Sequence, residues 1–547
     1  MGITVSDYLI SRLASLGVEE FFGLPGDYNF NIIESVENNP KTNWVGCTNE
    51  LNAGYAADGY ARIKGYGALI TTFGVGELSA INAIAGSMSE FVPVVKIVGV
   101  PDTKHIEQNA LIHHNLNTPD YHAFIKAYSN VVETAAFLNE QNAKEEIDRV
   151  LNVLINTKKP VYIAIPVDIC DKIIDDTYNV EVQKSDENNL NEAVNSALEL
   201  IENSQNPVIL ADVMVKRFCA KEQLYKFVKK TNYPVTTFLM SKDLINDYEF
   251  SNYIGTYVGK HANIKAYQTI SNSDCPIFIG AVISDINTHG FDLKFNPNDF
   301  INIQGNYTVV KNKMYKNVLM KDILEILCEK ITNKTSVQAG YDYYYSQVEP
   351  SKDKINTEYF YYKLQEFLRE GDNLILETGL INLAGAKLRI KKNVSVNNQI
   401  LWGSIGWATG AALGVDMADK NARTILVTGE GSHQLSAQEI STMMRNNLRP
   451  VIFVINNEGY TIERILSDDP MDKFNDIAKW NYSKLPYVFG ENVYSISVSN
   501  DIELCEAFRT IEKEQENKMC YIEMHFDMFE LPELAKKAID GLKLSKL

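Results

Sequence analysis

The stretch that decides the fold runs from Thr424 to Glu463 and reads TILVTGEGSHQLSAQEISTMMRNNLRPVIFVINNEGYTIE. Two short apolar runs within it, Ile425–Val427 and Val451–Ile455, are typical of buried parallel strands. Between them, apolar residues fall broadly on one side of a predicted helix, at Leu435, Ile440, Met443 and Met444. We therefore expect a strand, a helix and a second strand.

Both predicted strands end in residues suited to a bound ion or phosphate. Gly429-Glu430-Gly431 follows the first strand, and Asn456-Asn457-Glu458-Gly459 follows the second. Either motif alone is an ordinary turn after a strand. In an open parallel sheet, however, ligands bind at the carboxyl ends of strands. Oxygen-bearing side chains at neighbouring strand ends suit Mg²⁺ that holds a diphosphate, because Mg²⁺ prefers oxygen ligands and phosphates.

The paired motifs resemble the GDG and NN motif of the thiamin-diphosphate-dependent enzymes, and residues 459–463, GYTIE, narrow the resemblance to the pyruvate and indolepyruvate decarboxylase family. The resemblance implies thiamin diphosphate and Mg²⁺ as cofactors. It implies that the metal ligands are the side chains of Glu430 and Asn457 and the carbonyl of Gly459. The diphosphate would lie against a helix that begins near Ser432. The other implied cofactor contacts in this stretch are Gly429, Gly431, Tyr460, Thr461 and Ile462.

Further segments carry the same resemblance. Residues 48–62, TNELNAGYAADGYAR, match the family around its catalytic glutamate, so Glu50 would face the pyrimidine ring of the cofactor. A lone glutamate in a first helical turn is more often a dipole partner. In residues 401–406, LWGSIG, the family pattern implies that the carbonyl of Gly403 accepts from the pyrimidine amino group, that Ser404 lies beside the cofactor, and that Ile405 bends it. Thr378 matches a residue near the thiazolium.

Proton transfer after CO₂ loss needs titratable groups poised near neutrality. The resemblance implies four of them: Asp27, His113, His114 and Glu463. Glu463 would assist decarboxylation and the protonation that follows, and Asp27 with the histidines would protonate and release the aldehyde. Which group moves which proton is left open, since groups this close titrate as a coupled set. Adjacent residues do not easily share a face, so we expect no two-histidine metal site.

Alternating strand and helix patterns predict an α/β protein of three domains, each a parallel sheet flanked by helices. We place a pyrimidine-binding domain at residues 1–182, a central scaffold domain at 192–340, and a diphosphate-binding domain at 355–547. The expected strands in the first two domains are Glu20–Gly23, Trp44–Cys47, Ala68–Phe73, Val94–Val98 and Val161–Ile165, then Pro207–Leu210, Val235–Leu239, Pro276–Gly280 and Phe300–Gln304. A helix is expected from Asn49 to Lys64, closed by Gly65.

Composition excludes several classes of protein. The formal net charge of −18 argues against a nucleic-acid partner, which requires a basic face. No apolar run reaches membrane-spanning length, and the first ten residues lack the shape of a signal peptide. Seven cysteines are scattered without a CxxC pair, which favours reduced thiols in the cytoplasm. The expected partners are therefore a small 2-oxo acid and further copies of the chain.

The resemblance also implies the assembly. Glu50 and Glu430 belong to different domains but must contact one small cofactor. In the family this contact is made across two chains, so we expect a homodimer, or a dimer of dimers, with active sites between chains. A monomer is expected to be inactive.

Three departures from the family pattern bear on the substrate and the metal. Glu430 stands where the family has Asp, and its side chain is about 1.5 Å longer. Leu380 replaces a polar residue, and residues 465–469 replace a His-Gly pair. Bulky Ile462, together with Thr378, favours pyruvate or another short 2-oxo acid, whereas Asn382 and Ala384 could open space. The alternatives are a branched-chain or aromatic 2-oxo acid decarboxylase, an acetohydroxyacid-forming enzyme, and an inactive regulatory homologue.

Overall fold

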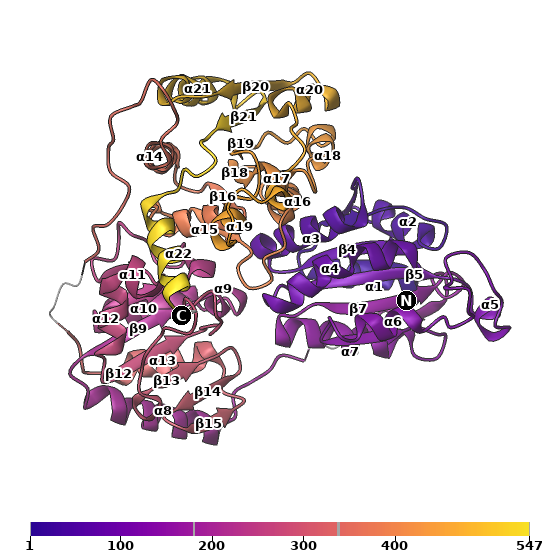
Figure 1. The fold of residues 1–547 in the computed structure, drawn as a ribbon. Helices are drawn as coiled ribbons and strands as arrows, with labels where there is room; N and C mark the ends of the chain where they lie inside the picture. The colour runs from indigo at the N-terminus through magenta and orange to yellow at the C-terminus, as the bar shows by residue number, and fades with distance from the viewer. Residues whose placement is uncertain (1, 179–180, 336–339, 546–547) are drawn as a thin grey trace.

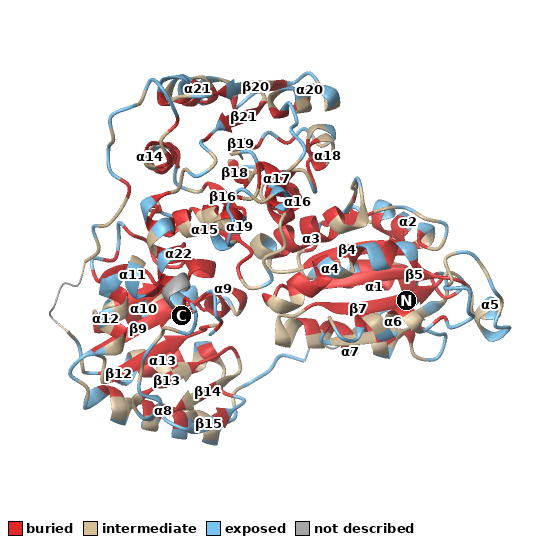
Figure 2. Cartoon of the chain, viewed as in Figure 1, coloured by how far each residue is buried: buried red, intermediate tan, exposed pale blue. Residues whose placement is uncertain are grey.

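The computed structural model describes residues 2–178, 181–335 and 340–545, and Figure 1 shows three sheets along the chain, each covered by helices. The α/β fold class is confirmed. Figure 2 shows most strands of these sheets as buried, with the exposed residues mainly on helices, loops and edge strands. Among the described residues, no helix combines the length and the apolar character needed to cross a membrane.

The first sheet has six parallel strands in the order β3-β2-β4-β5-β7-β6. Its strands are β2 (Glu20–Gly23), β3 (Asn43–Gly46), β4 (Gly67–Thr72), β5 (Val94–Val100), β6 (Thr134–Phe137) and β7 (Val161–Pro166). Its helices are α1 (Val5–Ser15), α2 (Phe30–Asn38), α3 (Glu50–Lys64), α4 (Val75–Ser89), α5 (Thr103–Glu107), α6 (Ala123–Tyr128) and α7 (Ala143–Thr157). A short antiparallel pair, β1 (Gly2–Thr4) and β8 (Ile173–Asp175), lies apart from this sheet. The strands predicted in this part of the chain are confirmed.

Helix α3 follows the predicted pattern closely. Its N-cap is Asn49, whose side chain accepts a hydrogen bond from the amide of Asn52, and its C-cap is Gly65 in the left-handed region at φ +94°. Asparagine and glycine are the residues that favour these two positions. The cap places Glu50 at the first helical residue, directly after the end of β3.

The central sheet is mixed rather than parallel throughout. Its order is β11-β10-β9-β12-β13-β14-β15, and the last two strands form an antiparallel hairpin. Its strands are β9 (Pro207–Ala211), β10 (Val235–Thr237), β11 (Tyr253–Thr256), β12 (Cys275–Ile279), β13 (Ile301–Ile303), β14 (Tyr307–Val310) and β15 (Lys313–Lys316). Its helices are α8 (Glu187–Glu202), α9 (Met214–Arg217), α10 (Lys221–Thr231), α11 (Gly259–Ala262), α12 (Ile264–Ser271) and α13 (Met320–Lys330). The hairpin turns at Lys311, whose φ of +55° permits a tight reversal.

The third sheet again has six parallel strands, in the order β17-β16-β18-β19-β21-β20. Its strands are β16 (Asn373–Leu376), β17 (Ser395–Asn398), β18 (Thr424–Gly429), β19 (Val451–Asn456), β20 (Val493–Val498) and β21 (Met519–His525). Its helices are α14 (Thr357–Phe367), α15 (Leu380–Gly385), α16 (Trp407–Ala418), α17 (Glu430–His433), α18 (Glu439–Arg445), α19 (Thr461–Leu466), α20 (Leu485–Phe489) and α21 (Asp501–Glu514). The last helix, α22 (Glu533–Ser545), packs against α11 of the central domain and against α15 (Figure 1).

The helix expected between β18 and β19 is broken. It begins at Glu430 rather than near Ser432, ends at His433, and resumes only at Glu439 as α18. Ile440 and Met443 are buried as predicted, but Leu435 lies in the break and is exposed. The break lets the hydroxyl of Ser436 bond to the carbonyl of Gly406, which ties this segment to the turn before α16.

Helices α3 and α16 pack against each other, so the first and third domains touch directly (Figure 1). Small residues make the approach possible. A Cβ on Gly414 would lie 1.8 Å from the carbonyl oxygen of Ala56, and one on Gly59 would lie 2.3 Å from that of Ala411. Neither position accepts a side chain without backbone movement.

Candidate active site

A cavity of about 470 Å³ opens at the carboxyl edge of the third sheet. Its walls come from the ends of β16, β18 and β19, the turn before α16, helix α19 and the segment that precedes α22. The predicted residues that line it are Thr378, Gly403, Ile405, Gly429, Glu430, Gly431, Ser432, Asn457, Gly459, Tyr460, Thr461, Ile462 and Glu463. The structure thus gathers this set at one place, and their roles in binding stay predictions.

The carboxylate of Glu430 lies at the floor of the cavity and is 2% exposed. Its Oε1 accepts hydrogen bonds from the backbone amides of Gly459 at 2.8 Å and Asn457 at 3.1 Å. Burial raises its pKa to about 7, although these amide contacts oppose the rise. A buried carboxylate on neighbouring strand ends is the kind of group that gains most from a bound cation.

The side chain of Asn457 turns one amide atom toward Glu430 and the other toward Thr461. The inward atom lies 3.0 Å from the carbonyl oxygen of Gly459 and 3.3 Å from each carboxylate oxygen of Glu430. The outward atom lies 2.8 Å from the hydroxyl of Thr461, which donates its single hydrogen to the carbonyl of Met528. Without an ion, the hydrogen bonds favour nitrogen inward and oxygen toward Thr461, whose hydroxyl can turn to donate to it; a bound cation would require the amide to turn its oxygen inward.

With this orientation, the Glu430 carboxylate, the Asn457 amide oxygen and the Gly459 carbonyl form an oxygen cluster. Neighbouring ligands of an octahedral ion held at about 2.1 Å are about 3.0 Å apart, which matches the spacing within the cluster. In the absence of an ion, a nitrogen turned inward donates to the Gly459 carbonyl and the Glu430 carboxylate, and the amide oxygen accepts from Thr461. With the oxygen turned inward, the residues present fit Mg²⁺.

Glycine shapes the cavity wall at two points. A Cβ on Gly431 would lie 2.5 Å from the ring of Tyr460, so only glycine lets that ring lie against the backbone after β18. Gly403 has φ +64° and turns the chain before Ile405, which projects into the cavity. Ser404 was expected beside the cofactor, but it does not line the cavity. Its hydroxyl bonds to that of Tyr55 at 2.6 Å.

Glu377 is a cavity residue that the sequence patterns did not single out. It follows the last residue of β16, lies at the cavity wall, and is 1% exposed. Burial raises its pKa to about 7. Its carboxylate accepts from the amide of Thr378 at 3.0 Å and from the hydroxyl of Thr428 at 3.3 Å. A search for polar residues at the ends of buried strands would have found it, because it comes directly after an apolar run at 374–376.

Part of the cavity wall is apolar. Leu380, Ile381 and Ile462 line it, with Tyr361 and Phe526 further along. Asn382 and Ala384 are buried but are not part of this wall. The expectation that they open space for a larger substrate is therefore not supported.

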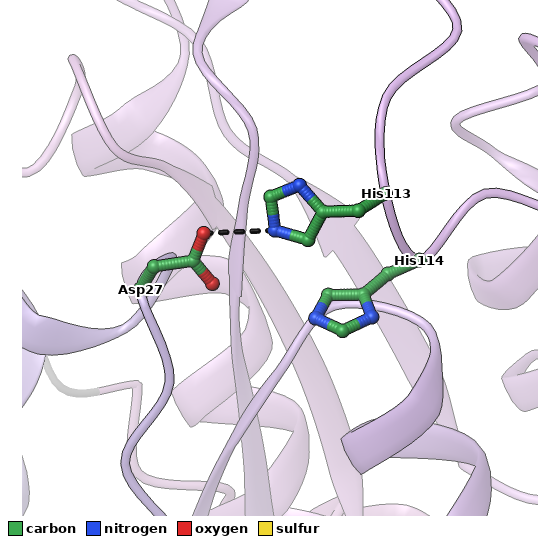
Figure 3. Close-up of side chains that lie close together, drawn as sticks. All are labelled: Asp27, His113 and His114. Atoms are coloured by element: carbon green, nitrogen blue, oxygen red, sulfur yellow. Dashed lines mark hydrogen bonds and ion pairs between the residues drawn. The ribbon is translucent and has the colours of Figure 1, made fainter.

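The remaining predicted residues lie on the first domain (Figure 3). His113 Nε2 lies 2.8 Å from Asp27 Oδ2, and the rings of His113 and His114 are 4.6 Å apart. The hydroxyl of Tyr28 lies 3.2 Å from His113 Nδ1, and burial raises the pKa of Tyr28 to about 12. Tyr28 therefore stays protonated, and its hydroxyl can donate a hydrogen bond to Nδ1 of His113. In that arrangement Nε2 of His113 carries a hydrogen that points at Asp27.

The side chains of His113 and His114 lie on the same side of the chain. We expected adjacent residues to point to different sides, and this expectation is wrong here. His114 has φ +69°, in the left-handed region, and this breaks the alternation of an extended chain. One ligand atom from each of Asp27, His113 and His114 lies within 4.8 Å of the others. The group is open to solvent in a single chain, since the side chains of His113 and Asp27 are 57% and 51% exposed.

Glu50 lies on the first domain rather than in the cavity. A Cβ on Gly76, at the start of α4, would lie 3.2 Å from Glu50 Oε1, so glycine leaves room for the carboxylate. Among the described residues, none before Thr357 lines the cavity. One chain therefore carries the oxygen cluster with Glu463 at one place, and Glu50, Asp27 and the two histidines at another.

A cavity at the carboxyl edge of a parallel sheet, next to a cluster of oxygen atoms, is the arrangement expected of a cofactor-binding enzyme site. Three family models match the chain. They are the N-terminal TPP binding domain of thiamine pyrophosphate enzymes over residues 3–123, the central domain over 194–328, and the C-terminal TPP binding domain over 377–524.

Curated relatives align over nearly the whole chain. The chain is 35% identical to pyruvate decarboxylase isozyme 3 of Saccharomyces cerevisiae and 36% identical to a pyruvate decarboxylase of Kluyveromyces lactis, with 98% of each chain covered. It is 38% identical to a pyruvate decarboxylase of Aspergillus fumigatus over 89% of this chain and 87% of that one. The chain belongs to the thiamine pyrophosphate enzyme family, as its sequence motifs predict. The domain limits at 1–182, 192–340 and 355–547 stay predictions.

Proposed function

We propose that this protein decarboxylates a 2-oxo acid non-oxidatively to an aldehyde and CO₂, with thiamin diphosphate and Mg²⁺, and that it favours pyruvate or another short 2-oxo acid. The observation that carries the proposal is the oxygen cluster beside Glu463 in one cavity, in a chain whose relatives are pyruvate decarboxylases.

The chain offers a consistent set of groups to hold the cofactor. Glu430, Asn457 and the Gly459 carbonyl would bind Mg²⁺, and the backbone after β18, at Gly431 and Ser432, would face the diphosphate. Gly403 and Ile405 would hold the pyrimidine end, and Glu50 would meet it. When bound, the cofactor supplies the electron sink that lets a 2-oxo acid lose CO₂.

In this proposal, Glu463, Asp27 and His113 transfer the protons that the reaction requires. The carbon that loses CO₂ must gain a proton, and the oxygen that becomes the aldehyde carbonyl must give one up before the aldehyde leaves. Glu463 lines the cavity and would serve the first part of this sequence. His113 is bonded on both ring nitrogens and can pass a proton between solvent, Asp27 and the substrate oxygen.

The apolar wall sets the expected substrate size. Ile462 and Leu380 narrow the cavity near Glu463, which favours a small side chain on the acid. An apolar pocket discriminates by only about 1–3 kcal/mol per methylene. We therefore expect pyruvate to be preferred and slightly larger acids to be turned over more slowly.

The active unit is a homodimer, or a dimer of two such dimers, in this proposal. Two observations support it. Within one chain, Glu50 and the cavity at Glu430 lie at separate places, and the apolar side chains of Val75 and Leu78, on the helix next to Glu50, are exposed. A second copy would bring Glu50, Asp27 and the histidines to the cavity. We also infer a cytoplasmic location, which the seven unpaired cysteines support.

The test is an aldehyde-release assay over pyruvate, 2-oxoisovalerate and phenylpyruvate, with thiamin diphosphate and Mg²⁺ present. We expect the highest kcat/KM for pyruvate. A clear preference for phenylpyruvate would contradict the proposed substrate, and acetohydroxyacid products would contradict the reaction. Cofactor binding without aldehyde from any acid would identify a non-catalytic homologue. Sizing chromatography that showed a fully active monomer would overturn the proposed assembly.

A further inference from the structure

We propose that Arg464 is a positioning residue for the metal loop, residues 457–460, and that it sets the affinity of the site for its divalent cation. The inference rests on the proposed function, because it concerns the Mg²⁺ site formed by Glu430, Asn457 and Gly459. Arg464 does not line the cavity and therefore acts through the loop rather than on substrate or cofactor.

The peptide between Glu458 and Gly459 is held on both sides. Its carbonyl oxygen accepts a hydrogen bond from Arg464 Nη2 at 3.0 Å. Its N–H donates to Glu430 Oε1 at 2.8 Å. Because the C=O and N–H of a trans peptide point in opposite directions, each contact fixes the orientation that the other requires. Arg464 thus aims the Gly459 amide at Glu430, and the next carbonyl joins the oxygen cluster.

The guanidinium is buried and bonded beyond the loop. It is 1% exposed, its Nη2 also pairs with Asp476 Oδ1 at 2.6 Å, and its Nη1 donates to the carbonyl of Pro470 at 3.1 Å. Burying a charge this deeply is costly unless its donors are satisfied, and both Nη atoms have partners while Nε has none among the described residues. The arginine therefore ties the metal loop to the segment 470–476 in a fixed geometry.

The metal loop needs such support because its backbone is strained. Glu458 has φ +63° and Gly459 has φ +137°, so two successive residues lie at positive φ. A non-glycine residue in this region costs about 1–3 kcal/mol and persists only where its surroundings hold it. A Cβ on Gly459 would lie 2.3 Å from the carbonyl oxygen of Asn475 and 2.8 Å from Arg464 Nη2. The guanidinium of Arg464 therefore packs against the loop at a point where only glycine leaves enough room.

Removing the guanidinium frees this peptide. The Glu458 carbonyl would lose its donor, the 458–459 peptide could rotate, and the Gly459 amide would leave Glu430. The cation ligands would remain, but their spacing would no longer be fixed. Loss of an outer support of a metal site typically lowers affinity about 10–100-fold.

The experiment uses calorimetric titration of the full-length protein with Mg²⁺ at saturating thiamin diphosphate. Arg464→Met should weaken Mg²⁺ binding about 10–100-fold. Arg464→Lys should weaken it less, since the ammonium keeps the charge and can still donate to part of the loop but lacks the planar fork of the guanidinium. Lys479→Met is the matched control. Lys479 pairs with the side chain of Glu458 at 2.9 Å on the surface but does not touch its carbonyl, so its loss should leave the affinity unchanged.

Thermal unfolding of the metal-free proteins separates the two possible roles. If Arg464→Met only lowered the melting temperature and kept the wild-type Mg²⁺ affinity, the inference would be overturned. Should Arg464→Met fail to fold, Arg464→Lys decides, and wild-type affinity in that variant would overturn the inference equally. Failure of the wild-type protein to bind Mg²⁺ with thiamin diphosphate would instead overturn the proposed function, on which this inference depends.

Discussion

The first and third domains share one strand order but carry different chemistry at their strand ends. In each sheet the second strand in sequence lies at one edge, followed by the first, third, fourth, sixth and fifth. Glu50 follows the second strand of the first domain, and Gly403–Ile405 follows the second strand of the third. Asp27 and Thr378 follow the two first strands in the same way.

The two domains differ most after their third strands. In the first domain β4 leads through Gly74 into the 15-residue helix α4, and the side chains of Asp27 and His113 are open to solvent. In the third domain β18 leads into the four-residue helix α17, and the break after it leaves room for a cavity with a buried carboxylate. In our proposal, one topology thus carries Asp27 and the histidines for proton transfer in the first domain, and the metal ligands together with Glu463 in the third.

The largest expected effect is on kcat, when the carboxylate of Glu50 in the first domain is removed. Glu50→Gln should lower kcat about 10²–10⁴-fold, the range for a lost acid–base group, while the affinity for Mg²⁺ changes little. Steady-state kinetics and calorimetry measure the two quantities. Glu187→Gln is the control, because Glu187 also opens a helix but is exposed on the central domain. Near-normal turnover in Glu50→Gln would show that the third domain suffices for catalysis.

A smaller effect is expected where the equivalent helices of the two domains meet. Gly414→Ala forces a methyl group against the carbonyl oxygen of Ala56, and overpacking of this kind costs about 1–3 kcal/mol. Urea unfolding measures the loss. Gly490→Ala is the control, since its added methyl would meet only the sulfur of Met444, which can move. Equal stability of the two variants would mean that α3 and α16 do not need this close approach.

The smallest effect concerns Asp416, on the same helix. Burial raises its pKa from 3.8 to about 7, and its Oδ2 has no hydrogen-bond partner. An acid whose pKa is raised by folding stabilises the protein less as pH rises from 3.8 to about 7, because the unfolded chain loses its proton first. Asp416→Asn should therefore raise the unfolding free energy by about 2 kcal/mol at pH 8 and by less at pH 5. An equal gain at both pH values, or none, would contradict the buried charge.

Much of this arrangement could be predicted from the sequence, because the ends of strands show as apolar runs followed by glycine and polar residues. Apolar runs followed by Gly429-Glu430-Gly431 and by Asn456–Gly459 place those residues at one edge of a parallel sheet, and the structure gathers them in one cavity. Asn49 and Gly65 similarly predict both ends of α3. These features depend on local backbone rules that a short segment obeys by itself.

The features that escaped prediction depend on contacts between distant segments or on single backbone angles. Predicting the hairpin β14–β15 would have required recognising from the sequence that the chain turns at Lys311. The common side on which the two histidines lie depends on the φ angle of His114. Leu435 fits a helical period, but the contact of Ser436 with Gly406 interrupts the helix there. No pattern around Arg464 indicates that its guanidinium reaches the Glu458 carbonyl, since that contact requires the loop to fold first.

The close packing of α3 on α16 has a consequence for how the polypeptide can be divided. These helices come from opposite sides of the central domain in sequence, yet they interlock without any space for a side chain at Gly414 or Gly59. A protease that cut the chain on both sides of the central domain would therefore release fragments that stay associated. Split expression of the two outer pieces should rebuild the same pairing without a covalent link between them.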